Sequence, residues 1–142
     1  MKEAKTPYCK CLYYSANALA RNITKIAAEE FAAVDLPPSY AFIVMTVNTN
    51  PGIQAGELSE IMMLTASTIT RLIEKLEVKG LIKRHNEGRT TLVYPTAESV
   101  KMNDSIKEAW YKLYLKYIDL LGEKQANELT NNIYNAALKL EK

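Results

Sequence analysis

Residues 65–84 have the sequence TASTITRLIEKLEVKGLIKR, and this stretch decides how the rest of the chain is organised. Its apolar residues recur at i, i+3, i+4 and i+7, the spacing of one face of an amphipathic helix, at Ile69, Leu72, Ile73 and Leu76. Thr65 is a candidate N-cap, because its hydroxyl can accept from a free amide of the first turn, and Gly80 is a candidate stop. After Gly80 the period changes to about two, which predicts a short strand from Leu81 to Arg84.

The opposite face of this predicted helix is polar, with short hydroxyls near its start and cations further on. Its residues are Ser67, Thr68, Thr70, Arg71 and Lys75. A face with small, hydroxylated side chains can enter a DNA major groove, which is about 12 Å wide. We interpret it as a face that reads bases and binds phosphate, with an ordinary solvated surface as the alternative.

Three further helices are expected before this one. The first 35 residues look like one long helix, which the prolines at 37 and 38 end because proline lacks the amide and crowds the preceding turn. Residues 39–47 predict a core helix, since they are apolar nearly all round. Residues 53–63 predict a third helix with Leu58, Ile61 and Met62 inward. Only Leu64 and Thr65 separate it from the next helix, which is the spacing of a helix-turn-helix.

A short hairpin is expected after the predicted strand. Residues 85–90 form its tip, where Gly88 can take a positive φ, and residues 91–95 return. An arginine at such a tip, here Arg89, suits a narrow minor groove, where the negative potential is strongest. Lys83 and Arg84 on the outgoing strand are better placed as phosphate ligands than as base readers.

The last 47 residues repeat the apolar pattern of the start of the chain. Steps of four and three join Ile106, Trp110, Leu113, Tyr117 and Leu120, and a second helix with the same pattern follows Gly122. A small winged domain cannot cover all these stripes, so we expect the terminal helices of two copies to interlock around a two-fold axis. The alternative is a monomer whose terminal helices pack only on each other.

The charge distribution agrees with a DNA-binding segment. The net charge of the 142-residue chain is only +2, yet residues 65–95 carry six Lys and Arg against three Asp and Glu. No apolar run of 18 residues occurs, so we expect a cytoplasmic protein with no membrane partner. One histidine, His85, and two cysteines are too few for a metal site, and no phosphate-binding loop or catalytic set is present, so neither a cofactor nor an enzyme activity is expected.

Over nearly its whole length the chain shares one order of elements with a known family. That order is helix, proline break, helix, helix-turn-helix, wing and two long helices, and its most specific part is Leu-Glu-x-Lys-Gly-Leu-Ile-x-Arg at residues 76–84. The chain therefore resembles the MarR-type winged helix-turn-helix transcription regulators. The resemblance implies a mainly α fold with a small β wing, in which residues 37–95 form the winged helix-turn-helix and residues 1–36 and 96–142 the dimerisation helices.

The resemblance also implies a function, that of a DNA-binding transcription regulator, which could act as a repressor or as an activator. A homodimer would bind a pseudo-palindromic operator in double-stranded DNA, with residues 65–79 in the major groove and the wing in the minor groove, and a small ligand or an oxidant would modulate it. Ser67, Thr68, Thr70 and Arg71 match the family's reading face, and Arg89 matches its wing arginine. Met63 stands where many members have glycine in the turn, so either this turn needs no positive φ or it is strained.

Two regulatory sites are candidates. One branch of the family senses hydroperoxides through a cysteine, and Cys9 with Tyr13 is similar to its spacing, since residues at i and i+4 share a helix face. Buried, inert cysteines are the alternative. A ligand pocket between the terminal helices and the winged domain would use Tyr13, Ile23, Phe42, Met45, Trp110 and Tyr114. A winged-helix module that binds another protein remains a separate functional alternative.

Overall fold

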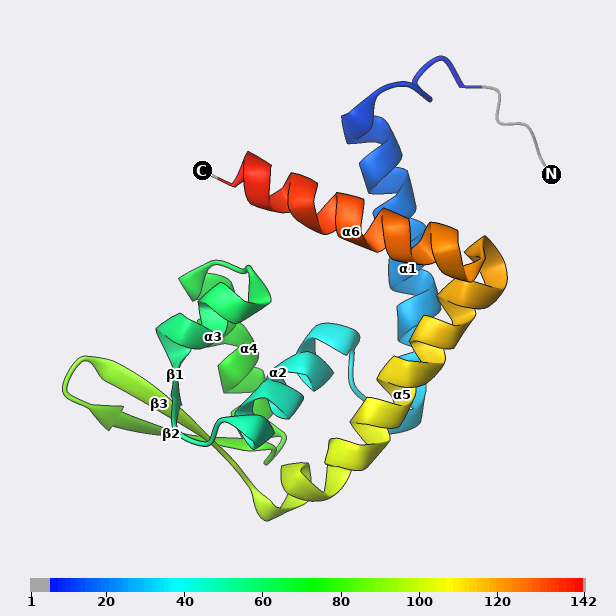
Figure 1. Ribbon diagram of the computed structural model, residues 1–142. Coiled ribbons are helices and arrows are strands. Elements are labelled where there is room, and N and C mark those ends of the chain that lie inside the picture. The colour runs from blue at the N-terminus through cyan, green and yellow to red at the C-terminus, as the bar shows by residue number, and fades with distance from the viewer. Residues whose placement is uncertain (1–5, 142) are drawn as a thin grey trace.

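The computed structural model describes residues 6–141, which form six α-helices, a short 3-10 helix and a small sheet. Figure 1 shows two parts joined by the long helix α5, with α1 and α6 crossing at one end and the winged helix-turn-helix at the other. The elements, in chain order, are α1 (Leu12–Phe31), η1 (Ala32–Val34), α2 (Pro38–Thr49), β1 (Ile53–Gln54), α3 (Ala55–Met62), α4 (Ala66–Val78), β2 (Ile82–Glu87), β3 (Thr90–Pro95), α5 (Ala97–Leu121) and α6 (Glu123–Leu140). The predicted fold class, mainly α with a β wing, is confirmed.

One continuous core holds the winged part on α1 and α5. It is made of side chains with almost no exposed surface, which include Phe31, Ile43, Leu58, Ile69, Leu76, Val93 and Ile106. The apolar stripe predicted for residues 65–79 is confirmed, because all four of its side chains are buried on the inner face of α4. The reading face is therefore turned outward by the same packing that stabilises the helix.

The beginning of the chain differs from the prediction of one long helix. Residues 7–10 form turns, and α1 begins only at Leu12 after the extended Cys11. Residues 1–5 of the predicted helix lie outside the described residues. The amide of Cys11 donates to the carbonyl of Tyr8 at 2.9 Å, so a local turn takes the place of the first helical turns.

The predicted third helix is also shorter than expected. Ile53 and Gln54 form the strand β1, because they pair with Val93 and Leu92 of β3, and α3 begins at Ala55. A two-residue strand is too short to show a period in the sequence. The inward placement of Leu58 is confirmed, but that of Ile61 is wrong, since Ile61 is 52% exposed and faces a groove toward α6 rather than the core.

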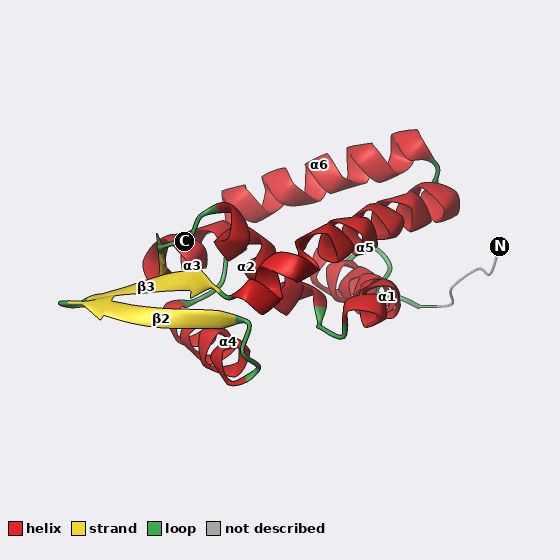
Figure 2. Ribbon diagram, turned by 90° about the horizontal axis from the view of Figure 1, so that it is seen from below, coloured by secondary structure: helices red, strands yellow, loops and turns green. Residues whose placement is uncertain are grey.

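The wing is a longer and tighter hairpin than expected. The sheet has the antiparallel order β1-β3-β2, and β2 and β3 remain paired out to Glu87 and Thr90. Only Gly88 and Arg89 connect them, so the prediction that residues 85–90 form the tip is wrong. Gly88 has the expected positive φ, +62°, which a two-residue hairpin connection needs at its first central position. Figure 2 shows this hairpin projecting beyond the helices, with α4 alongside β2.

Candidate nucleic-acid interface

The start of α4 is fixed by the cap that the sequence predicts. The Thr65 hydroxyl oxygen accepts from the Thr68 amide at 3.3 Å, and its proton is donated to the Thr68 hydroxyl at 2.9 Å. The Ser67 hydroxyl lies 3.3 Å from the same oxygen. These contacts gather three hydroxyls at the helix N-terminus, where the free amides and the helix dipole favour an anion such as a phosphate.

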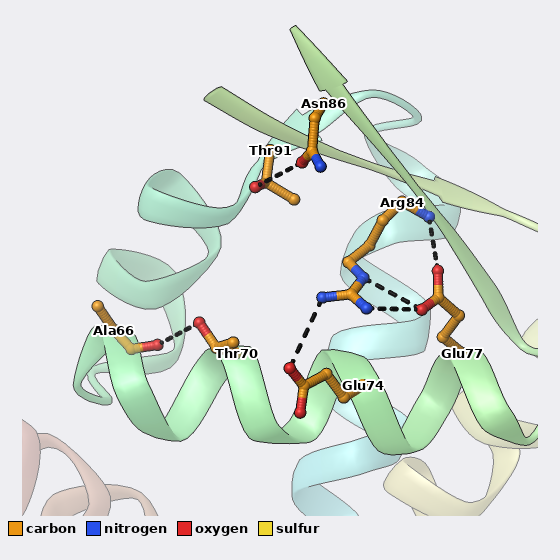
Figure 3. A network of polar contacts seen from close by, with 7 residues as sticks. All are labelled: Ala66, Thr70, Glu74, Glu77, Arg84, Asn86 and Thr91. Atoms are coloured by element: carbon orange, nitrogen blue, oxygen red, sulfur yellow. Dashed lines mark hydrogen bonds and ion pairs between the residues drawn. The ribbon is translucent and has the colours of Figure 1, made fainter. Parts of the chain in front are cut away.

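The cations and hydroxyls predicted for the reading face lie on the outer side of α4. Ser67, Thr70, Arg71 and Lys75 are exposed, whereas Thr68 is partly buried. The Thr70 hydroxyl donates its proton to the carbonyl of Ala66 at 2.9 Å, which leaves its oxygen to accept from a ligand (Figure 3). Within residues 6–141, Arg71 and Lys75 form no ion pair, so both charges remain free.

The turn before α4 has a positive φ at Met63. Its φ is +56°, so this turn does take the left-handed conformation that favours glycine. The Met63 amide donates to the Glu60 carbonyl and the Leu64 amide to the Ser59 carbonyl, both at 3.2 Å. These bonds form a Schellman motif with a methionine at the position where glycine is preferred.

The wing cations point in different directions. Side chains alternate across a strand, so Arg84 lies on the same face as the buried Ile82 and turns toward α4. Lys83 lies on the other face, and Arg89 lies at the tip. Within residues 6–141, Lys83 and Arg89 form no ion pair, and both are exposed. The structure therefore leaves these two cations available to a ligand.

Arg84 is held by α4, the predicted recognition helix, as Figure 3 shows. Its Nη2 and Nε donate to the same oxygen, Oε1, of Glu77 at 2.8 and 3.1 Å, and its backbone amide donates to Oε2 at 3.3 Å. Glu74 lies 3.8 Å from Nη1. The hydrogen bond from Arg84 lowers the pKa of Glu77 below its ordinary value of 4.5, and the same bond raises the pKa of Arg84.

Sequence reasoning identified Arg84 as a phosphate ligand and did not single out Glu77. Two signals were available. The period-two alternation after Ile82 directs Arg84 inward, and Thr70, Glu74 and Glu77 follow at i, i+4 and i+7 on one side of the helix. A cation on the inner face of a strand, beside an acidic helix flank, points to an ion pair.

The Cys9 hypothesis loses its geometric basis. Cys9 lies in the turn before α1, so it does not share a helix face with Tyr13. Within residues 6–141 no hydrogen bond joins these two side chains, and Ser15 donates instead to the Cys9 carbonyl at 3.2 Å. Both cysteines are free thiols and exposed, so the alternative that they are buried is also wrong.

The residues predicted for a ligand pocket lie in different surroundings. Phe42 packs edge to face on Trp110, with ring centroids 5.8 Å apart, and on Phe31 at 5.7 Å. Tyr13, at the start of α1, is 79% exposed. Ile23 lines a different groove, which lies between α1, α5 and α6.

This groove between the terminal helices has a volume of about 550 Å³. Nearly all its lining residues are apolar, and they include Leu19, Ile23, Tyr117, Leu120, Leu129 and Ile133. Leu120 is 60% exposed and Ile133 45%.

None of the helices in the described part of the chain combines the length and apolar character that a membrane crossing needs.

Comparison with known proteins identifies the arrangement. Residues 36–87 match the MarR family, which covers the helix-turn-helix and the outgoing strand of the wing. This region belongs to the MarR family of transcription regulators. The predicted resemblance is confirmed for the winged helix-turn-helix, the part of the sequence that marks it most specifically.

Similar proteins include transcription regulators. An uncharacterized HTH-type transcriptional regulator of Bacillus subtilis, YybA, is 28% identical over 87 residues, a match that spans 59% of this chain but only 58% of YybA. The HTH-type transcriptional regulator SarZ of Staphylococcus aureus is 22% identical over 92% of this chain and 86% of its own length. The solved transcriptional repressor CouR has the same fold, both bound to p-coumaroyl-CoA (TM-score 0.84, 18% identity, 95% of this chain and 98% of CouR) and bound to a 23-mer DNA duplex (TM-score 0.82, 18% identity, 96% and 99%).

Proposed function

We propose that this MarR-type chain binds double-stranded DNA as a homodimer on a pseudo-palindromic operator and regulates transcription there, with repression as the expected outcome. The observation that carries the proposal is the outer face of α4, where Arg71 and Lys75 have no ion-pair partner among residues 6–141 and lie beside the hydroxyls of Ser67 and Thr70. CouR, which has the same fold, is described bound to a DNA duplex.

The proposed binding mode follows from the relative positions of α4 and the wing. With α4 in the major groove, Ser67, Thr70 and Arg71 face base edges and Lys75 faces phosphate. Lys83, on the outer face of β2, contacts the phosphate backbone of the DNA, and Arg89 at the wing tip approaches the adjacent minor groove. Thr68 is partly buried, so we assign it to shaping the helix N-terminus and to a peripheral contact.

The homodimer is proposed from the exposed apolar surface of the terminal helices. Large apolar side chains on three helices are substantially exposed, among them Leu12, Trp110, Tyr111, Leu120, Ile133, Tyr134 and Leu140. Extensive exposed apolar surface of this kind is typical of an interaction site. A second copy placed about a two-fold axis would cover the groove between α1, α5 and α6 and would place two α4 helices about one DNA turn, roughly 10 base pairs, apart.

We further propose that an effector changes the affinity for DNA. We infer a small-molecule effector, because CouR, which has the same fold, is described bound to p-coumaroyl-CoA. Oxidation at Cys9 is the second candidate, supported by its exposed free thiol. Cumene hydroperoxide separates the two: loss of operator binding in wild type but not in Cys9→Ser supports the thiol, and equal loss in both excludes it.

The proposal is tested by selecting bound duplexes from a random DNA pool and measuring gel-shift affinity for the selected site. Arg71→Ala is expected to weaken binding by a factor that corresponds to roughly 1–3 kcal/mol and to relax specificity. Arg89→Ala is expected to weaken binding with less effect on sequence preference. Lys124→Ala on the distant helix α6 is the matched control. Unchanged affinity in both variants would remove this face from the DNA interface.

The functional alternative, a winged-helix module that binds another protein through the same face, predicts a different salt response. Binding of phosphates releases counterions, so the affinity for DNA falls steeply as salt is added. Salt-insensitive binding to a protein partner, without binding to any selected duplex, would favour the module.

A further inference from the structure

We propose that Arg84 is a positioning residue, which with Glu77 fixes the wing against the recognition helix so that Arg89 reaches DNA. This inference rests on the proposed function. It replaces the expectation that the Arg84 guanidinium itself binds a phosphate, because that group is already engaged within the chain.

The contact joins the helix to the main chain of the wing as well as to its side chain. One oxygen of the Glu77 carboxylate accepts from Nη2 and Nε of Arg84, and the other accepts from the Arg84 amide. Glu74, one helical turn earlier, adds an ion pair at 3.8 Å to Nη1. A carboxylate that accepts from both the backbone amide and the side chain of one strand residue restrains the position of the strand as well as that of the side chain.

The strand that carries this contact needs a second support. The sheet order β1-β3-β2 makes β2 an edge strand, whose only hydrogen-bonded neighbour within the sheet is β3. The strand continues beyond Arg84 to Glu87, and at roughly 3.3 Å per residue the tip lies on the order of 15 Å from the contact. A small tilt at Arg84 is therefore a larger displacement at Arg89.

Exposure of the two side chains fits a positioning role. Arg84 and Glu77 side chains are 34% and 38% exposed, so water reaches the pair but does not surround it. Arg71, Lys75, Lys83 and Arg89, by contrast, carry no ion pair in the described part of the chain. Of these five cations, Arg84 is the one that α4 holds within residues 6–141.

The two roles for Arg84 predict opposite effects of neutralising Glu77. If Arg84 is a phosphate ligand, removing the nearby carboxylate frees its guanidinium, makes the surface more positive and tightens DNA binding. If Arg84 positions the wing, the same substitution releases β2 and weakens binding. The sign of the change decides between them.

The experiment measures the affinity of the full-length protein for the selected duplex by fluorescence anisotropy. Glu77→Gln and Arg84→Gln are each expected to weaken binding roughly threefold to tenfold. The double variant is expected to bind no more weakly than the single variant with the lower affinity. Glu87→Gln, on the same strand and with its carboxylate 3.8 Å from His85 Nε2, is the matched control and is expected to bind as wild type or slightly more tightly. Tighter or unchanged binding by Glu77→Gln would overturn the inference.

The same substitution in an Arg89→Ala background tests whether the effect passes through the wing tip. Positioning predicts that Glu77→Gln has almost no further effect once Arg89 is absent, because there is no tip contact left to misplace. An equal loss in both backgrounds would show that the pair only supports the fold, and it would overturn the inference. Wild-type protein that binds no duplex at low salt would instead refute the proposed function itself, so the two failures are distinct.

Discussion

The hydroxyl of Thr96 donates a hydrogen bond of 2.8 Å to the carbonyl oxygen of Gly80. Gly80 follows the recognition helix α4, and Thr96 is the N-cap of the long helix α5, whose first turn it also caps by accepting from the Ser99 amide at 3.2 Å. One side chain thus ties the end of the proposed DNA-reading helix to the start of the proposed dimerisation helix.

Replacing Thr96 with valine keeps the shape of the side chain and removes this hydroxyl. We expect the free energy of unfolding to fall by about 1–2 kcal/mol, because the variant loses an N-cap and leaves the Gly80 carbonyl without its partner. Urea unfolding measures the change. Thr49→Val, at an exposed position whose hydroxyl donates to the Met45 carbonyl of its own helix, is the control and should change stability much less. Equal losses in the two variants would deny the contact any special role.

The two helices of the helix-turn-helix end in the same motif with different residues. Gly80 has a φ of +76° after α4, and Met63 has a φ of +56° after α3. Because a side chain at positive φ costs roughly 1 kcal/mol, Met63→Gly is expected to stabilise the protein by about 0.5–1 kcal/mol. Thermal and urea unfolding test this, with Ile61→Gly, an exposed position inside α3, expected to destabilise. A loss of stability in Met63→Gly would show that its side chain contributes more than the strain costs.

Long periodic segments were predictable from the sequence, and short pairings were not. The stripe from Ile69 to Leu76 fixed α4 and its outward face, because four apolar residues at helical spacing leave one packing solution. The strand at Ile53 escaped notice, since its pairing with Val93 depends on a residue 40 positions away. Glu77 was missed for a related reason: its partner lies on another element, and only the strand alternation after Ile82 indicates it.

The Arg84–Glu77 pair makes a pH-dependent contribution to stability. The folded-state pKa of Glu77 is lowered from its ordinary value of 4.5, so the contribution is present above that value and disappears as the pH falls through the folded pKa. Because both side chains are about one third exposed, we expect less than about 1 kcal/mol. In urea unfolding, the difference between wild type and Glu77→Gln should be present at about pH 7 and should shrink as the pH is lowered through the acidic range. A difference that grows on acidification would contradict this sign.

The proposed dimer predicts a change of molecular mass on charging the groove between α1, α5 and α6. Leu120→Glu places a carboxylate in that groove and is expected to give a monomer, since an unpaired charge in an apolar interface is costly. Val100→Glu, an equally exposed apolar position on the same helix outside the groove, is expected to remain dimeric. Analytical ultracentrifugation measures the molecular mass of both variants. A wild-type monomer, or a dimer in both variants, would place the subunit contact elsewhere.

The central claim is that α4 and the wing bind DNA through their free cations, and a salt titration of duplex binding tests it most directly. With roughly six to ten phosphates neutralised by a dimer, raising the salt from about 50 to about 200 mM should lower the affinity on the order of a thousandfold or more. Arg71→Ala should bind more weakly at every salt concentration. Wild-type protein that is monomeric and binds no duplex even at low ionic strength would contradict the account.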